Sequence, residues 1–256
     1  MLRTQIRIRL ILQFVHYVKR MGVISFKMKM GCINLGGYKV ISFDKIHSTQ
    51  TYALKLVADG RASDHTAIVA QAQSAGRGRY RRTWVSHHGN LYVSFIFDSY
   101  ERNPQIAYAV AVAVAETILS YGVEPQIKWP NDILIDGAKV CGILIEYAGP
   151  FVVIGIGVNI KTNPTVESYR TTRLDKYVSD ISVTDFLGRV MRNLDIWLSC
   201  EFPTVRARWM NLAVGLNKTV KYRGTDVQLI EINADGALVL RDNTRYFLAW
   251  GDEIGA

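Results

Sequence analysis

The sequence has little cysteine and proline, and no apolar segment long enough to span a membrane. Its 256 residues include three cysteines and six prolines. Cys32, Cys141 and Cys200 form neither a CxxC pair nor a metal-binding spacing, which argues against a disulfide-rich fold and favours a reducing compartment. The apolar helix predicted over residues 103–122 contains Glu116 and is too short to cross a bilayer. We therefore expect a cytoplasmic protein without a membrane partner, and Cys141 within its core.

Acidic residues are missing from the first 43 residues, which hold eight lysines and arginines. The net charge of +9 comes mainly from this segment, because the rest of the chain has 23 basic and 22 acidic residues. A nearly neutral body argues against a general nucleic-acid-binding surface. The basic extension, residues 1–37, fits an organelle-targeting peptide, a translation start that really lies at Met21, Met28 or Met30, or a structural extension. A targeting peptide would place the protein in an organelle matrix.

The common motifs for nucleotides and metals are also missing. The chain has no GxxxxGK[ST] sequence, and both GRGRY and GIGVNI lack the third glycine of a dinucleotide-binding turn. The five histidines show no HExxH spacing, and His87 and His88 are expected in a loop. We therefore expect no metal site built from a cluster of side chains.

Hydrophobic periodicity predicts an α+β protein in the region 38–208. A helix is expected from a cap at Ser48 or Thr49 to about Asp59, and another is expected from Thr184 to about residue 202. Pro130 interrupts an apolar segment and predicts a bend or a strand end there. Strands are expected at 38–44, 65–73, 90–97, 126–135, 138–147 and 151–160, and a polar loop at 161–183. After Trp209, short strands separated by turns predict a small β-domain, residues 209–256.

Arginines concentrate between residues 77 and 82, at Arg77, Arg79, Arg81 and Arg82. This segment could bind nucleic acid, remain an exposed loop, or close over a small anionic ligand. Lys139 opens the apolar run KVCGILIE, and a buried ammonium group needs an anionic partner. The alternative is that Lys139 is an exposed hairpin lysine that follows Gly137.

Several of these motifs, in this order and spacing, resemble those of biotin protein ligases. The resemblance covers residues 40–256 and includes the sequences STQ (48–50), QAQSAGRGRYRRTW (71–84), GNLYVS (89–94), KWPNDIL (128–134), GAKVCGILIE (137–146) and VIGIGVNI (153–160). It implies a mixed central sheet with flanking helices, the class II synthetase-like biotin/lipoate ligase fold. It also implies that the C-terminal domain is a small SH3-like β-barrel.

The resemblance further implies a two-step ligase that uses biotin and ATP with Mg²⁺ bound to the phosphates. Biotinyl-5′-AMP forms first, and its biotinyl group then passes to a lysine of a biotin carboxyl carrier protein. Lys139 and Arg77 would be catalytic. The implied biotin-binding residues are Ser48, Thr49, Gln50, Gln73, Arg77, Gly78, Arg79, Lys139 and Gly142, and the implied nucleotide-binding residues are Arg79, Trp84, Lys128, Asn131 and Asn159.

The chain departs from the family pattern at three positions. Arg81 stands where the family commonly has glycine, Tyr80 where a basic residue is common, and Gln50 where asparagine is frequent. The arginine loop is expected to be mobile when empty and ordered over the adenylate. The residues before the first strand show no helix-turn-helix pattern, so we expect a ligase without a winged-helix repressor domain. A homodimer is plausible by resemblance, and the alternative functions are lipoate ligation and nucleic-acid binding through RGRYRR.

Overall fold

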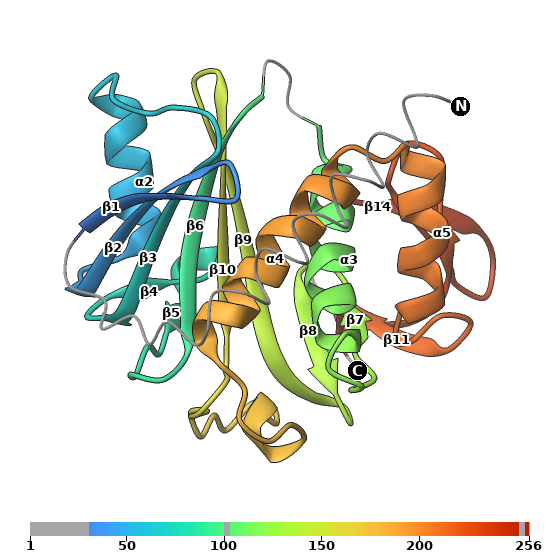
Figure 1. Ribbon diagram of the computed structural model, residues 1–256. Helices are drawn as coiled ribbons and strands as arrows, with labels where there is room; N and C mark the ends of the chain where they lie inside the picture. Colours follow the sequence, from blue (N-terminus) through green and yellow to red (C-terminus); the bar gives the residue numbers. More distant parts are fainter. Residues whose placement is uncertain (1–30, 100–102, 251–253, 256) are drawn as a thin grey trace, which may run out of the picture.

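The core of the protein is an eight-stranded mixed sheet, seen in a computed structural model that describes residues 31–99, 103–250 and 254–255 (Figure 1). Strands β2 and β3 are parallel and all other neighbours in this sheet are antiparallel. The strand order is β1 (Gly31–Leu35), β2 (Tyr38–Ile46), β3 (Thr66–Gln73), β6 (Leu91–Asp98), β10 (Phe151–Val158), β9 (Ala138–Ala148), β8 (Asp132–Ile135) and β7 (Gln126–Lys128).

Helices cover both faces of this sheet, so most of its strands are buried on both sides. Helix α2 (Thr49–Ala58) packs on one face, where Ala53 and Leu56 meet Ile68, Ile96 and Val153. Helices α3 (Ile106–Leu119) and α4 (Val183–Leu198) pack on the other face (Figure 1). Because strand side chains alternate between faces, each strand carries two sets of core residues, which explains its nearly continuous apolar sequence.

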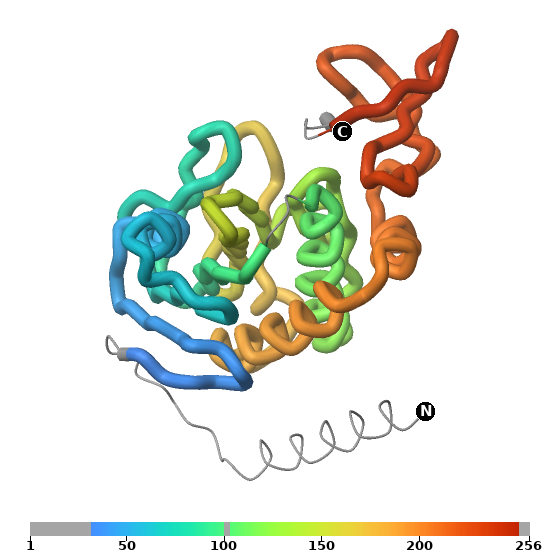
Figure 2. The backbone as a smooth tube through the Cα atoms, turned by 90° about the horizontal axis from the view of Figure 1, so that it is seen from above, coloured from blue at the N-terminus to red at the C-terminus, as the bar shows by residue number. Residues whose placement is uncertain are grey.

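The C-terminal strands form a separate antiparallel sheet in the order β14, β13, β12, β11, β15. Figure 2 shows these strands as a lobe beside the main body, reached through helix α5 (Phe202–Leu212). This sheet is the expected SH3-like domain. Its strands are β11 (Thr219–Tyr222), β12 (Thr225–Ile232), β13 (Leu238–Arg241), β14 (Tyr246–Ala249) and β15 (Ile254–Gly255).

The sequence-based elements agree with the structure except in a few places. Helix α4 is capped by Ser182, whose hydroxyl accepts from the Asp185 amide, so the prediction of Thr184 as its cap was wrong. Helix α5 was not predicted; Pro203 in its first turn presets the backbone for a new helix and was the available signal. Strand β1 was also not predicted, since it lies in the expected extension, and residues 1–30 of that extension lie outside the described residues.

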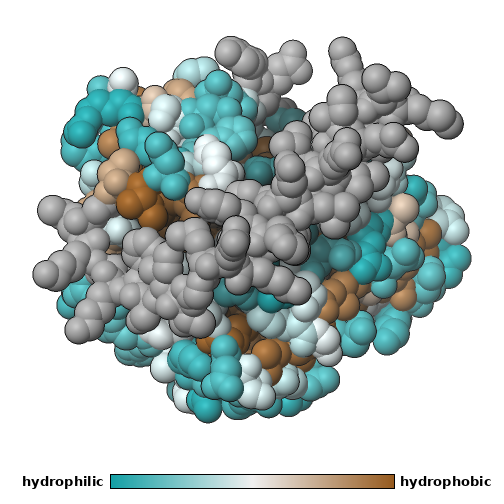
Figure 3. Space-filling model, in the orientation of Figure 1, coloured by the Kyte–Doolittle hydropathy of each residue, from teal (hydrophilic) through white to brown (hydrophobic). Residues whose placement is uncertain are grey.

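The apolar segments serve the core. Cys141 is buried, as predicted, and burial raises the pKa of its thiol. Within the described ranges, no helix is both long and apolar enough to cross a membrane. The face drawn in Figure 3 is mainly hydrophilic where its residues are coloured, and its hydrophobic residues occur in scattered groups.

Candidate functional site

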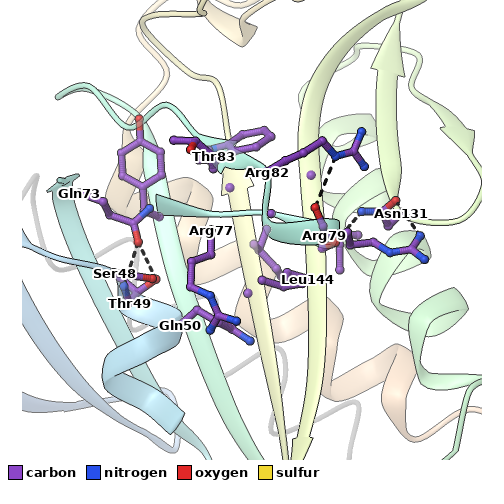
Figure 4. Close-up of a pocket in the computed structure, with 18 of the residues that line it drawn as sticks. Ser48, Thr49, Gln50, Gln73, Arg77, Arg79, Arg82, Thr83, Asn131 and Leu144 are labelled. Atoms are coloured by element: carbon purple, nitrogen blue, oxygen red, sulfur yellow. Dashed lines mark hydrogen bonds between the residues drawn. The ribbon is translucent and has the colours of Figure 1, made fainter. Parts of the chain in front are cut away.

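A cavity of about 320 Å³ opens on the face of the sheet that carries α2. The arginine loop, which contains β4 (Gly76–Arg77), the short helix η1 (Arg79–Arg81) and β5 (Thr83–Trp84), forms one wall (Figure 4). The cavity brings together most of the predicted site residues: Ser48, Thr49, Gln50, Gln73, Arg77, Gly78, Arg79, Trp84, Asn131, Lys139 and Gly142. Lys128 and Asn159, predicted for the nucleotide, do not line it.

Glycines in neighbouring strands create the floor of the cavity. Gly142 of β9 pairs directly with Gly157 of β10, and the Trp84 ring lies over both. A Cβ atom on Gly157 would lie 2.6 Å from the Trp84 ring atoms Cε2 and Nε1, and one on Gly142 would lie 2.8 Å from its Cζ3. A side chain at either position would therefore displace the indole. Trp84 Nε1 is buried, with no hydrogen-bond partner among the described residues.

The start of α2 supplies hydrogen-bonding groups at one end of the cavity. Ser48, one of the two caps that the sequence predicted, caps the helix by accepting from the Thr51 amide at 3.3 Å, and Thr49 is the first residue of the helix. Gln73 Oε1 accepts from the Thr49 amide at 2.8 Å and lies 3.2 Å from the Thr49 hydroxyl. Gln73 Nε2 donates to Ser86 at 2.9 Å, so these side chains are held in fixed orientations. Figure 4 shows Gln73 pointing down to Ser48 and Thr49.

A second polar network lies beside the first and includes two residues that the sequence analysis did not select. Ser94 Oγ is 2.9 Å from both Gln50 Oε1 and Thr49 Oγ1. Gln50 Nε2 donates to Glu146 Oε2 at 3.0 Å, and Arg77 Nη2 donates to Glu146 Oε1 at 2.8 Å. Ser94 could have been found as the one serine in the apolar run LYVSFIF, whereas Glu146 at the end of GILIE gave no such signal.

Lys139 occupies the other end of the cavity, between an acid and two aromatic rings. Its Nζ is 2.7 Å from Asp132 Oδ1 and 5.4 Å from the ring centroids of both Trp84 and Tyr169. Its side chain is only 16% exposed, so the alternative of an exposed hairpin lysine was wrong. Tyr169 comes from the polar loop after β10 and was not predicted. Carboxylate and ring faces together hold the ammonium group in a defined position.

The arginine loop turns three of its four arginines toward the cavity. Arg77, Arg79 and Arg82 line the cavity, while Arg81 does not. Arg79 Nη1 lies 3.5 Å from Asn131 Oδ1, and Asn131 Nδ2 donates to the Ile143 carbonyl at 2.8 Å (Figure 4). The loop therefore contacts the KWPND turn between β7 and β8, where Pro130 breaks the pairing as expected.

The loop backbone carries the departure from the family pattern. Tyr80 and Arg81 have φ angles of 52° and 59°, the left-handed region that favours glycine. The position where glycine is common thus adopts a conformation that suits glycine, although the residue is arginine. Elsewhere in the described part of the chain, no group of three or more His, Cys, Asp or Glu side chains could hold a metal ion.

The chain is similar to the same group of proteins in sequence and in structure. Residues 42–163 match the model of the Biotin/lipoate A/B protein ligase family. The Bifunctional ligase/repressor BirA of Bacillus subtilis is 30% identical over 230 residues, covering 81% of this chain and 70% of that protein. The Biotin–[acetyl-CoA-carboxylase] ligase of Mycobacterium tuberculosis is 33% identical over 158 residues, which span 58% of this chain and 59% of that protein.

Solved structures extend the likeness to the fold. The biotin protein ligase of Aquifex aeolicus in complex with biotin and ATP superposes with a TM-score of 0.73 at 25% identity, covering 84% of this chain and 97% of that one. The Leishmania major biotin protein ligase in complex with biotinyl-5-AMP gives a TM-score of 0.64 at 23% identity, covering 83% and 98%.

Proposed function

Because the chain belongs to the biotin/lipoate A/B protein ligase family, we propose that it is an ATP-dependent biotin–protein ligase. It forms biotinyl-5′-AMP and then transfers biotin to a lysine of a biotin carboxyl carrier protein. One observation carries this proposal: a single cavity joins a hydrogen-bonding end, suited to a cyclic urea, to a cationic end, suited to a carboxylate and phosphates.

The hydrogen-bonding end offers both donors and acceptors, as the ureido ring of biotin requires. The Ser48 hydroxyl accepts from the helix and can still donate its own hydrogen. Gln73 Nε2 donates one hydrogen to Ser86 and keeps the second for a ligand carbonyl. Gln50 Oε1 lies at the cavity and accepts from Ser94, which leaves one lone pair for a ring N–H. Polar groups fixed in this way in a mainly apolar slot determine how a ligand is oriented.

The cationic end serves the first chemical step. A biotin carboxylate oxygen attacks the α-phosphorus of ATP, the new C–O–P link forms, and the bond to pyrophosphate breaks. Both reactants are anions, so Lys139, Arg77 and Arg79 offset their repulsion and stabilise the charge of the transition state. Magnesium would enter on the ATP phosphates and supply further positive charge, in keeping with its preference for phosphate oxygens and water.

The second step needs access for a protein and exclusion of water until the protein arrives. The amine of the acceptor lysine attacks the carbonyl of the mixed anhydride, the amide forms, and AMP leaves with the bonding electrons. The arginine loop forms a wall of the cavity, and we propose that it orders over the adenylate and shields the anhydride from hydrolysis. Ordering the loop costs about 1–2 kcal/mol per residue, and each charge-assisted hydrogen bond to the ligand returns about 1.5–3 kcal/mol.

Exchange of labelled pyrophosphate into ATP tests the adenylation step directly. We expect exchange that depends on biotin and Mg²⁺, with no exchange when lipoate replaces biotin. Exchange with lipoate alone would assign the chain to the sister activity, and no exchange with either acid would refute an adenylating ligase. Transfer is then measured as a mass increase on a carrier domain, with its acceptor lysine replaced by arginine as the control.

A further inference from the structure

We propose that Glu146 is a positioning residue that makes Gln50 a hydrogen-bond acceptor toward the ligand, and so selects a ligand that offers a ring N–H at this place. The inference rests on the proposed function, since a cyclic urea presents such an N–H on each side of its carbonyl. Glu146 belongs to β9, two residues from the cavity-lining Leu144 and on the same face of the sheet.

The amide of Gln50 is buried, and its two hydrogens are both in use. Its Nε2 donates to Glu146 Oε2 at 3.0 Å and to the Val153 carbonyl at 3.2 Å. Its Oε1 accepts from Ser94 Oγ at 2.9 Å. An amide nitrogen carries two hydrogens and an amide oxygen two lone pairs, so the one capacity left on Gln50 is an acceptor site on Oε1.

The carboxylate of Glu146 prevents the opposite orientation of this amide. If the amide turned over, Oε1 would face the Glu146 carboxylate and the Val153 carbonyl, so that acceptors would face acceptors without a hydrogen between them. Val153 pairs directly with Glu146 across β10 and β9, so the Val153 carbonyl and the Glu146 carboxylate lie close together beside Gln50 Nε2. The hydrogen bond to the charged Glu146 is the stronger of the two.

Gly155 allows the amide to reach this position. An added Cβ atom on Gly155 would lie 2.6 Å from Gln50 Oε1, so the oxygen rests directly on the glycine backbone. Gly155 lines the cavity, and the oxygen therefore lies at the cavity surface. Figure 4 shows Gln50 and Arg77 approaching each other, and Glu146 is the hydrogen-bond partner of both.

Glu146 also accepts from Arg77 at 2.8 Å, so its removal affects the anion-binding loop as well. The two effects differ in what they discriminate. Arg77 offers only donors and a positive charge, which we assign to the anionic tail that biotin and its carbamates share, so its disturbance should change the binding of all three equally. The orientation of Gln50 acts on the ring, and its disturbance changes the preference between rings.

The test compares biotin with its two isosteric cyclic carbamates, in each of which oxygen replaces one ring N–H. Dissociation constants are measured by calorimetry on the full chain for the wild type, Glu146→Leu, Glu146→Gln, Gln50→Asn and the double variant Gln50→Asn/Glu146→Leu. We expect the wild type to bind biotin about a hundredfold more tightly than one of the carbamates, because an acceptor facing the Gln50 oxygen leaves a buried polar group unpaired. Glu146→Leu should weaken the binding of biotin about tenfold and lower this preference about tenfold.

The matched variants separate the positioning role from a structural one. Glu146→Gln keeps an acceptor oxygen for Gln50 and should retain most of the preference. In the Gln50→Asn background the shorter amide does not reach Glu146, so Glu146→Leu acts there only through Arg77 and should change the preference between biotin and the carbamates less than twofold. Equal weakening of biotin and both carbamates by Glu146→Leu, or the same change of preference in both backgrounds, would overturn the proposal. A wild type that binds no biotin would refute the proposed function as well, whereas normal adenylation with an unaltered preference in Glu146→Leu would refute this inference alone.

Discussion

Replacement of Lys139 by methionine should reduce adenylation far more than it destabilises the fold. The Lys139 ammonium lies at the cationic end of the cavity, 2.7 Å from Asp132. Loss of one preorganised group that stabilises transition-state charge lowers the rate by about 10²–10³-fold. We therefore expect biotin-dependent pyrophosphate exchange in Lys139→Met to fall by that factor at saturating ATP.

The stability cost follows from how far the ion pair is buried. Lys139 and Asp132 have side chains that are 16% and 25% exposed, between a surface pair and a fully buried one. Breaking a fully buried pair by removing one partner costs about 3–5 kcal/mol, because the other charge stays without compensation. Exposed pairs contribute about 0–1 kcal/mol. An intermediate loss of about 1–3 kcal/mol in the free energy of unfolding is expected from urea titration.

Lys55 provides the matched control, because it also pairs with an aspartate. Its Nζ lies 3.0 Å from Asp59 Oδ2, but its side chain is 68% exposed and does not line the cavity. Lys55→Met should cost under about 0.5 kcal/mol and leave exchange unchanged. The reasoning is refuted if Lys139→Met retains exchange within threefold of the wild type, or if the two variants lose the same stability.

Three further predictions concern the floor of the cavity, the loop and the core. Gly157→Ala should lower the free energy of unfolding by about 1–3 kcal/mol, because the added methyl group displaces the Trp84 ring. The control, Gly188→Ala in α4, should be neutral or stabilising, because its added Cβ meets only Arg192 Nη1 at 3.8 Å. Equal effects of the two variants in urea unfolding would contradict the packing. Biotin plus ATP should slow trypsin cleavage within residues 77–82 several-fold, as measured by mass spectrometry of the fragments. An unchanged cleavage rate would count against loop closure. Burial raises the pKa of Tyr108 to about 12, so its contribution to stability is fully present below the unfolded pKa of about 10 and is lost as the pH rises toward 12. Between about pH 9 and 11, the free energy of unfolding of Tyr108→Phe should therefore fall by about 1 kcal/mol less than that of the wild type. Parallel losses in the two proteins would refute the assignment.

Local sequence determined most of the elements and many of the residues of the site. Ser48 was recognisable as a helix cap because its partner, the Thr51 amide, lies three residues away. Pro130 was recognisable as a strand break because proline lacks the N–H that a central strand needs. The arginines of residues 77–82, and the motifs that carry Gln73 and Lys139, were likewise visible as short patterns.

The partners of these residues were decided by the order of strands. Strand β10 lies between β6 and β9, which brings Ser94, Gly157 and Gly142 onto one surface although they are far apart in sequence. Hydrophobic alternation indicates that a residue lies on a face, but it does not indicate which strand will be its neighbour. The pair of Glu146 with Gln50 was therefore not readable from the sequence.

The sequence by itself thus determined which chemical groups the protein has and on which kind of element each one lies, because caps, turns and periodicity depend on residues a few positions apart. The tertiary structure alone decided which of those groups meet. It excluded Lys128 and Asn159 from the cavity lining, brought Tyr169 to Lys139, and set the amide of Gln50 between Ser94 and Glu146. Such contacts depend on long-range pairing, in which free energy is shared across the whole sheet and no short segment specifies the result.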